Sequence, residues 1–242
     1  MPNKGDEGEV SIINKIFMHR NDKQWNYNYF GQYSCTVLIS PSEFLKWENK
    51  LHWSPIENEK QIKKAGGSFK ADLILIFSDT SLIKRVSIKC FDGGAPTIMN
   101  HTHRAANCWT ECLNPPDTLV FLMNELRTLG THGEDIKLSD LQLNASELKN
   151  LKEIVLYFVS EGSGNKKSKV SSDSILYAKN NEIIQFYPSV SDYVDSLITS
   201  QKLVLSMRSK GYTGKKALAD REWVYEEPGK KPKGALNIRL IT

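Results

Sequence analysis

The chain has 242 residues, a length that fits one large domain or two small, closely packed ones. Hydrophobic residues make up 40% of it and charged residues 25%, as in ordinary soluble globular proteins, which excludes a chain that is disordered throughout. The apolar runs are strand-sized and the first residues lack the apolar core of a secretory signal. We therefore expect no membrane span, no export and a cytoplasmic location.

The net charge of +4 is too small to indicate a nucleic-acid partner, but the charge is unevenly distributed. From Arg208 to Arg239 there are nine Lys and Arg residues against four Asp and Glu residues. A segment with this bias can contact phosphates, although a solvated lysine-rich surface has the same composition. The four cysteines are too few for a disulfide framework in a chain of this length, and we expect them to be reduced.

Hydrophobic periodicity and turn residues predict the elements of the N-terminal part. Apolar residues recur at helical spacing over 7–18, and this helix has acids at its start, where the helix dipole favours them. Residues 19–32 form a polar stretch with no assigned element. We then expect a strand over 33–40, a helix over 41–53, and strands over 69–77 and 82–91 joined by a turn at 78–81.

The C-terminal part is also a mixture of helices and strands. Asn144 or Ser146 caps a helix within 138–162, and a flexible polar loop follows over 162–174. The other predicted elements are a helix over 98–113, a strand beginning at 118, a hairpin over 174–187 that turns at Asn180-Asn181, a helix over 189–200, and strands over 202–209 and 235–242. This mixture predicts an α/β (α+β) fold.

An acid and a lysine occupy matching places on the two strands of the first predicted hairpin. Hydrolysis of a phosphodiester bond needs a hard divalent cation, and Mg²⁺ takes oxygen ligands. Asp72 supplies an anchoring carboxylate, and Lys89 comes two residues after Ser87, on the same face of the sheet. There the lysine can hold or polarise the attacking water and stabilise the developing charge. The order of an acid, a strand, a turn and a strand ending in x-K resembles the PD-(D/E)xK nucleases.

Three further groups complete the predicted site. Glu9, on the first helix, is the candidate outer acid that binds the ion directly or through water. The backbone carbonyl of Ile88 is a candidate metal ligand. Ser87 departs from the pattern, which prefers Asp or Glu, and its hydroxyl is a weaker ligand that could hold a metal-bound water instead. The alternative interpretation of Asp72 and Lys89 is a solvated acid at a strand edge and a surface lysine.

The segment Gly66-Gly67-Ser68-Phe69-Lys70-Ala71-Asp72, followed by a strand and Ser87-Ile88-Lys89, resembles the catalytic hairpin of the MspI-like restriction endonucleases. This group of four-base-pair cutters includes HhaI and tolerates amides at the position of Ser87. The helix with Glu9 resembles theirs as well. So does the C-terminal stretch with Leu205-Ser206-Met207-Arg208-Ser209-Lys210-Gly211, then Lys230-Lys231-Pro232-Lys233, and a closing apolar strand.

The resemblance implies a Mg²⁺-dependent type II restriction endonuclease that hydrolyses double-stranded DNA at a short palindrome, of four base pairs with a central CG. It implies a restriction-endonuclease-like mixed central β-sheet flanked by helices. A catalytic subdomain would cover 1–129 and a DNA-recognition subdomain 130–242. It also implies a monomer with one active site, and a cognate DNA methyltransferase in the same restriction-modification system.

Base recognition in the major groove requires paired hydrogen-bond donors for guanine. Arg208 is the first candidate and Arg104 the second, because helices after the catalytic hairpin face the DNA in this family. One set of lysines could contact bases or phosphates: Lys230, Lys231 and Lys233. Another set has the character of phosphate contacts, which position the DNA without specifying its sequence: Lys210, Lys215 and Lys216. For each lysine, plain surface charge is the alternative.

Other interpretations of the sequence stay open. Four zinc-type ligands lie within a short stretch, namely His101, His103, Cys108 and Cys112, but their spacing matches no common structural zinc site, and the cysteines suit a buried helix face. Ser87 favours a protein that binds DNA without cutting it. A repair or recombination nuclease of the same superfamily, which cuts by DNA structure rather than by sequence, is the third possibility.

Overall fold

The computed structural model describes residues 4–32, 36–50, 54–91, 97–101, 136–137, 142–163, 166–200, 203–209 and 234–240. The chain divides into two compact units, and each of them is built from two separate stretches of sequence. Unit 1 comprises Met1–Gly94 and Lys167–Tyr193, and unit 2 comprises Ala95–Lys166 and Val194–Thr242. The predicted boundary between residues 129 and 130 lies outside the described residues. Residues 167–193, expected in the recognition subdomain, belong to unit 1.

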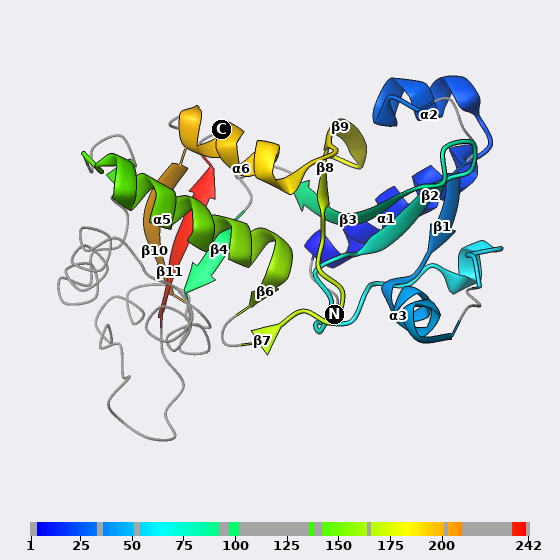
Figure 1. Ribbon diagram of the computed structural model, residues 1–242, viewed down its shortest axis with the longest axis horizontal. Helices are drawn as coiled ribbons and strands as arrows, with labels where there is room; N and C mark the ends of the chain where they lie inside the picture. Colours follow the sequence, from blue (N-terminus) through cyan, green and yellow to red (C-terminus); the bar gives the residue numbers. More distant parts are fainter. Residues whose placement is uncertain are drawn as a thin grey trace. The chain divides into compact units, whose positions relative to one another are not determined.

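Unit 1 contains a mixed five-stranded sheet (Figure 1). Its strands, in spatial order, are β1 (Thr36–Ile39), β2 (Leu73–Phe77), β3 (Leu82–Phe91), β8 (Ser174–Lys179) and β9 (Glu182–Tyr187). Neighbouring strands are antiparallel except β3 and β8, which run parallel. The predicted α+β class is therefore confirmed, and the parallel pair explains why residues beyond 167 join the N-terminal stretch.

A tight turn joins the two strands of each antiparallel hairpin in this sheet. Asn180 and Asn181, between β8 and β9, have φ angles of 50° and 62°, which is the left-handed pair that a two-residue hairpin turn requires. Asn adopts this conformation more readily than most residues because its side chain can hydrogen-bond locally. Ser81, in the turn between β2 and β3, has a φ of 52°. Both hairpins were predicted from the sequence and are confirmed.

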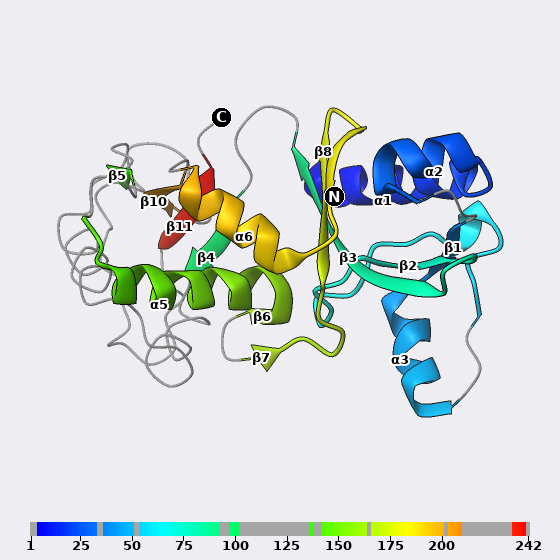
Figure 2. The same cartoon turned by 45° about the horizontal axis from the view of Figure 1, so that its top comes forward.

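Helices cover both faces of the sheet in unit 1. On one face α1 (Lys4–His19) buries Ile12, Ile13 and Ile16 in a core that also contains Leu73, Leu75, Phe77, Val86 and Ile88. On the other face α3 (Pro41–Lys50) packs Phe44 in a second core with Ile39 and Ile74. Figure 2 shows α1 and α3 on opposite sides of β1 and β2. The period of two along β2 produces this division between the faces.

Helix α2 (Lys23–Phe30) lies in the polar stretch to which we had assigned no element, so that part of the prediction was wrong. The carboxylate of Asp22 caps its start by accepting a hydrogen bond of 3.0 Å from the Trp25 N–H. Gly31, with a φ of 68°, ends it in the left-handed conformation. The buried Asn26 side chain accepts a 2.6 Å hydrogen bond from the Thr36 hydroxyl. Caps, one buried amide and three aromatic side chains that pack on the core, Trp25, Tyr29 and Phe30, define this helix.

Unit 2 contains an antiparallel four-stranded sheet with the order β4 (Thr97–His101), β11 (Gly234–Leu240), β10 (Leu203–Ser209) and β5 (Ile136–Lys137). The predicted helix over 98–113 is wrong at 98–101, because these residues pair with β11. Its remainder and the strand predicted from 118 lie outside the described residues. Asn144 caps α5 (Ala145–Leu156) in a capping box with Glu147, as predicted.

The other elements are short or link the two units. They are the 3₁₀ turn η1 (Glu59–Gln61), the π-helical turn η4 (Tyr157–Glu161), the strands β6 (Gly162–Ser163) and β7 (Lys166–Lys167), and the helix α6 (Val190–Thr199). Among the described helices, none is long and apolar enough to cross a membrane.

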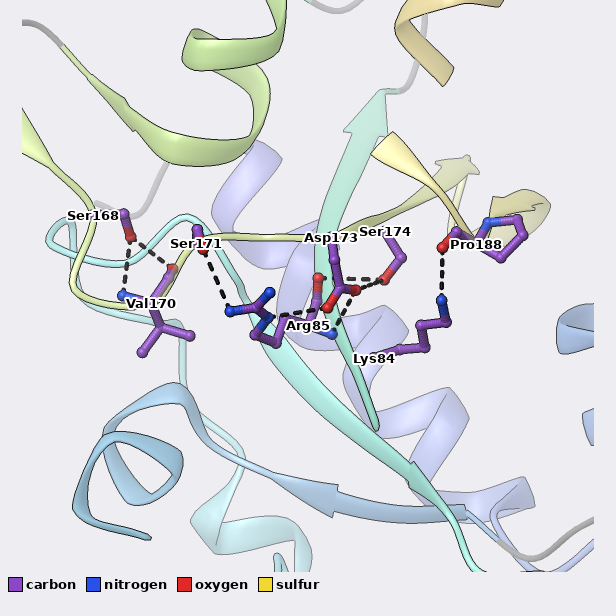
Figure 3. Close-up of polar contacts among 8 residues, drawn as sticks. All are labelled: Lys84, Arg85, Ser168, Val170, Ser171, Asp173, Ser174 and Pro188. Atoms are coloured by element: carbon purple, nitrogen blue, oxygen red, sulfur yellow. Dashed lines mark hydrogen bonds and ion pairs between the residues drawn. The ribbon is translucent and has the colours of Figure 1, made fainter. Parts of the chain in front are cut away.

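The segment between β7 and β8, predicted as a flexible polar loop, is fixed by hydrogen bonds. The carboxylate of Asp173 accepts bonds from the backbone N–H and the Nε of Arg85, at 2.9 and 3.0 Å (Figure 3). The Ser174 hydroxyl donates to the carbonyl of Arg85 at 3.2 Å. These contacts align the start of β8 with β3. The polar residues Asp173 and Ser174 serve here as hydrogen-bond partners of the neighbouring strand.

Helix α1 approaches strand β3 very closely at Gly8. A Cβ atom at this buried glycine would lie 2.8 Å from the Cβ of Cys90, a separation that side chains do not tolerate. The absence of a side chain thus allows the first turns of α1 to lie against β3. Because Glu9 follows directly, this close approach also fixes where Glu9 stands relative to the sheet.

We expect Gly8→Ala to lower the free energy of unfolding. Alanine would gain about 0.5–1 kcal/mol of helix propensity, but forcing a methyl group against Cys90 costs about 1–3 kcal/mol. Urea unfolding followed by circular dichroism measures the net effect. The control is Gly67→Ala, since no heavy atom lies within 4 Å of a Cβ at that exposed position. A Gly8→Ala protein as stable as the wild type would contradict this packing.

Candidate functional site

The centre of the site is the carboxylate of Asp72, which directly precedes β2. Its backbone N–H donates to the carbonyl of Val86 at 2.8 Å, so Asp72 extends the pairing of β2 with β3. Its Oδ2 accepts hydrogen bonds from the Ile88 N–H at 2.8 Å and from the Ser87 hydroxyl at 3.3 Å. The structure thus brings together Asp72 and the Ser87-Ile88 part of the predicted constellation.

Strand alternation places the side chains of Ser87 and Lys89 on one face of β3. Val86 and Ile88 point into the core beneath α1, so the residues between and after them point away from it. Ser87 is 1% exposed, and its hydroxyl is held by the Asp72 carboxylate. The positive charge of Lys89 acts on the carboxylates of both Asp72 and Glu9. The predicted hairpin geometry is therefore present, while the catalytic roles of these residues stay predictions.

Glu9 reaches the same place from α1. The pKa of its carboxyl group is raised from 4.5 to about 7, chiefly by burial and then by the negative charge of Asp72, against the lowering effect of Lys64 and Lys89. Its Oε2 atom is buried and has no hydrogen-bond partner among the described residues. A buried oxygen without a donor is costly, by about 1–3 kcal/mol, so Glu9 is well suited to receive a proton or a cation.

The pKa of Asp72 is also raised, chiefly by burial. Four groups oppose this effect by favouring the ionised carboxylate: the ammonium of Lys89, the N–H of Ile88, the hydroxyl of Ser87 and the ammonium of Lys64. The two carboxylates are close enough for their charges to repel. A divalent cation between them would relieve that repulsion and replace the lost hydration of both.

The donor set fits magnesium better than zinc. No group of three or more His, Cys, Asp or Glu side chains suited to a metal occurs in the described part of the chain, which leaves Glu9 and Asp72 as paired carboxylates. Mg²⁺ is commonly held by one or two carboxylates together with waters and substrate phosphates. Such an ion would explain why one carboxylate oxygen of Glu9 is buried without a hydrogen-bond partner among the described residues. That the backbone carbonyl of Ile88 is a metal ligand stays a prediction.

Sequence reasoning assigned no role to Lys70, which lies two residues before Asp72. Its pKa is lowered to about 8, chiefly by burial and then by the nearby Lys89 ammonium, while the Asp72 carboxylate opposes this lowering. The charge of Lys64 also acts on Glu9 and Asp72, and its salt bridge with Asp6 raises the pKa of Lys64 itself. The signal that could have found Lys70 was its place only two residues before Asp72 in the chain.

The predicted DNA-reading residues are placed only in part. Arg208 lies in β10, opposite Ala235 of β11. His101, the first of the zinc-type residues, ends β4. The other candidates fall outside the described residues: Arg104, Lys210, Lys215, Lys216, Lys230, Lys231 and Lys233 for DNA, and His103, Cys108 and Cys112 for zinc. Among the described residues, Cys90 forms no disulfide bond.

Comparison with known proteins finds similarity among solved structures. No protein-family model matches the chain, and no curated protein matches it. Among solved structures, the restriction endonuclease MspI in complex with its cognate DNA is similar over 95% of this chain and 88% of that chain, with 13% sequence identity and a TM-score of 0.39. These values do not establish a shared family, so a functional assignment rests on the residues of the site.

We expect the stability of the metal-free protein to fall as the pH rises from about 4.5 to about 7. The pKa of the Glu9 carboxyl group is about 7 in the folded chain and near 4.5 in the unfolded chain. Within this window Glu9 therefore stays protonated when folded but loses its proton when unfolded. Glu9→Gln should remove part of this decline, and Glu7→Gln, at an exposed neighbour, should not. Urea unfolding in EDTA across this pH range measures it; parallel curves for wild type and Glu9→Gln would refute the assignment.

Proposed function

We propose that the protein is a Mg²⁺-dependent DNA endonuclease with a restriction-endonuclease-like catalytic sheet. The observation that carries this proposal is the buried, unpartnered carboxylate oxygen of Glu9 beside the hydrogen-bonded carboxylate of Asp72. Lys89, on the neighbouring strand β3, acts electrostatically on both. Two oxygen-donor carboxylates and a lysine are the groups that hydrolysis of a phosphodiester bond requires.

The residues of the site divide this chemistry among them. Mg²⁺, when bound, supplies a positive charge that polarises the phosphate and favours loss of a proton from water. Asp72 and Glu9 would hold the ion, and the Ile88 N–H keeps the Asp72 carboxylate in one orientation. The Lys89 ammonium would donate hydrogen bonds to the attacking water or to a phosphate oxygen, where negative charge develops. Ser87 orients Asp72 through its hydroxyl.

The finer proposal is a type II restriction endonuclease. The likeness of 66–72 and 87–89 to the MspI-like catalytic hairpin supports it. Such an enzyme would cut double-stranded DNA at a four-base-pair palindrome containing CG, act as a monomer in the cytoplasm, and have a cognate methyltransferase. Arg208 and Arg104 are the candidates for reading bases. Phosphate and further base contacts would come from the C-terminal lysines: Lys210, Lys215, Lys216, Lys230, Lys231 and Lys233.

A second candidate function is DNA binding without cleavage. The contact of Ser87 favours it, because this hydroxyl bonds to Asp72 where the general pattern has a further carboxylate. A nuclease that recognises DNA structure would share the site but give no fixed fragments. Incubation of unmethylated plasmid DNA with Mg²⁺ separates the three: discrete fragments, no cleavage, or cleavage without a fixed pattern.

We expect Asp72→Ala and Lys89→Ala to reduce DNA cleavage by at least about 10²-fold while DNA binding persists, since each removes a group that acts on the reacting phosphate rather than on the bases. Cleavage of plasmid DNA in Mg²⁺ and gel shift in EDTA measure the two properties. Asp79→Ala, in the exposed turn at the far end of β2, is the matched control and should cleave normally. Wild-type rates in Asp72→Ala would show that the site lies elsewhere.

We expect Ser87→Ala to cleave DNA at a rate within about tenfold of the wild type. The lost hydroxyl contributes one hydrogen bond to Asp72, worth about 0.5–1.5 kcal/mol, and the stronger bond from the Ile88 N–H remains. Initial cleavage rates over a range of Mg²⁺ concentrations measure this. If Ser87→Ala were as inactive as Asp72→Ala, the serine would have to act on the metal or the water directly.

A further inference from the structure

Two segments of unit 1 concentrate positive charge next to Asp72. Residues 60–71 contain four lysines, residues 167–172 contain two, and neither segment contains an Asp or Glu. In the whole chain the balance is nearly even, with 32 Lys and Arg against 28 Asp and Glu. Lys64 is partly neutralised by Asp6, but the excess over the two segments remains large.

Hydrogen bonds join these two segments into one surface. The Lys169 N–H donates to the carbonyl of Ser68 at 2.9 Å. The Lys70 N–H donates to the hydroxyl of Ser168 at 2.7 Å and the carbonyl of Val170 at 3.0 Å. The Ala71 N–H also donates to Val170, at 3.2 Å. The later segment is therefore held against the residues that lead directly into Asp72, about 100 positions away in sequence.

Ser168 anchors the segment that carries Lys167 and Lys169. Its hydroxyl contacts the backbone of Ser68 and Lys70 in the earlier segment. It also donates to the carbonyl of Val170 (Figure 3). Lys167 is the last residue of β7, and Lys169 lies at the bend that follows, so the two lysines flank Ser168 in the chain. Both are exposed to solvent. At this spacing the Cα atoms of the two lysines are at most about 7 Å apart.

We propose that Lys167 and Lys169 bind backbone phosphates of the DNA strand whose phosphate reaches Asp72. The proposal rests on the proposed function and deepens it: it adds a DNA-backbone surface within the catalytic unit to the base-reading residues expected further along the chain. A lysine ammonium binds a phosphate as a point charge and reads no base, so this surface would position DNA of any sequence.

The test is the salt dependence of binding to a short random-sequence duplex in EDTA. A lost phosphate contact reduces the slope of log affinity against log salt by about 0.9. We expect such a reduction, together with weaker binding at low salt, in Lys167→Ala and in Lys169→Ala. Lys169→Arg keeps the charge and should keep the slope. Lys23→Ala, at an exposed lysine of α2, is the control for a general loss of charge.

The outcomes separate this inference from the function beneath it. Slopes reduced in Lys167→Ala and Lys169→Ala, but not in Lys23→Ala or Lys169→Arg, support the surface. If the wild type binds and cleaves DNA and all variants keep its slope, the surface is refuted while the endonuclease stands. If the wild type neither binds nor cleaves any DNA, both are refuted.

Discussion

The 2.8 Å hydrogen bond from the Ile88 N–H to the Asp72 carboxylate is the contact on which the candidate site depends. It spans the β2–β3 hairpin, so the same pairing that builds the sheet fixes the orientation of the carboxylate. The neighbouring Ser87 hydroxyl adds a second donor to the same oxygen, and alternation sets Lys89 on that side of β3. A buried ionised group is tolerated only with such partners. The site is thus preorganised by regular secondary structure rather than by loops.

Charge compensation decides which groups can be buried beside that carboxylate. The carboxylates of Glu9 and Asp72 repel each other, and the positive charges of Lys64 and Lys89 stabilise both. Burial, and then the charge of Lys89, lowers the pKa of Lys70. One carboxylate oxygen of Glu9 still has no donor among the described residues. In the metal-free chain a proton meets part of this need, and a divalent cation would meet it more fully. Proton and metal binding would therefore compete at Glu9.

The parallel pairing of β3 with β8 adds a distant piece of chain to the site. Asp173 clamps Arg85 at the start of this pairing, and the segment before it bonds to the backbone of residues 68–71. A parallel connection requires a long crossover, which explains why unit 1 is discontinuous in sequence. The residues between its two stretches belong to unit 2 and need not share its stability or its role.

The sequence by itself determined the features that depend on local pattern: the helix at 7–18, the hairpin with Asp72 and Lys89 on matching faces, and the Asn180-Asn181 turn. It could not show that residues 97–101 form a strand, because that depends on pairing with β11, over 130 residues later. Nor could it show that Glu9 has a buried oxygen without a donor, or that 167–170 bonds to 68–71. Periodicity and turn propensity act over a few residues, whereas burial, partner strands and charge neighbours are set only when distant segments meet.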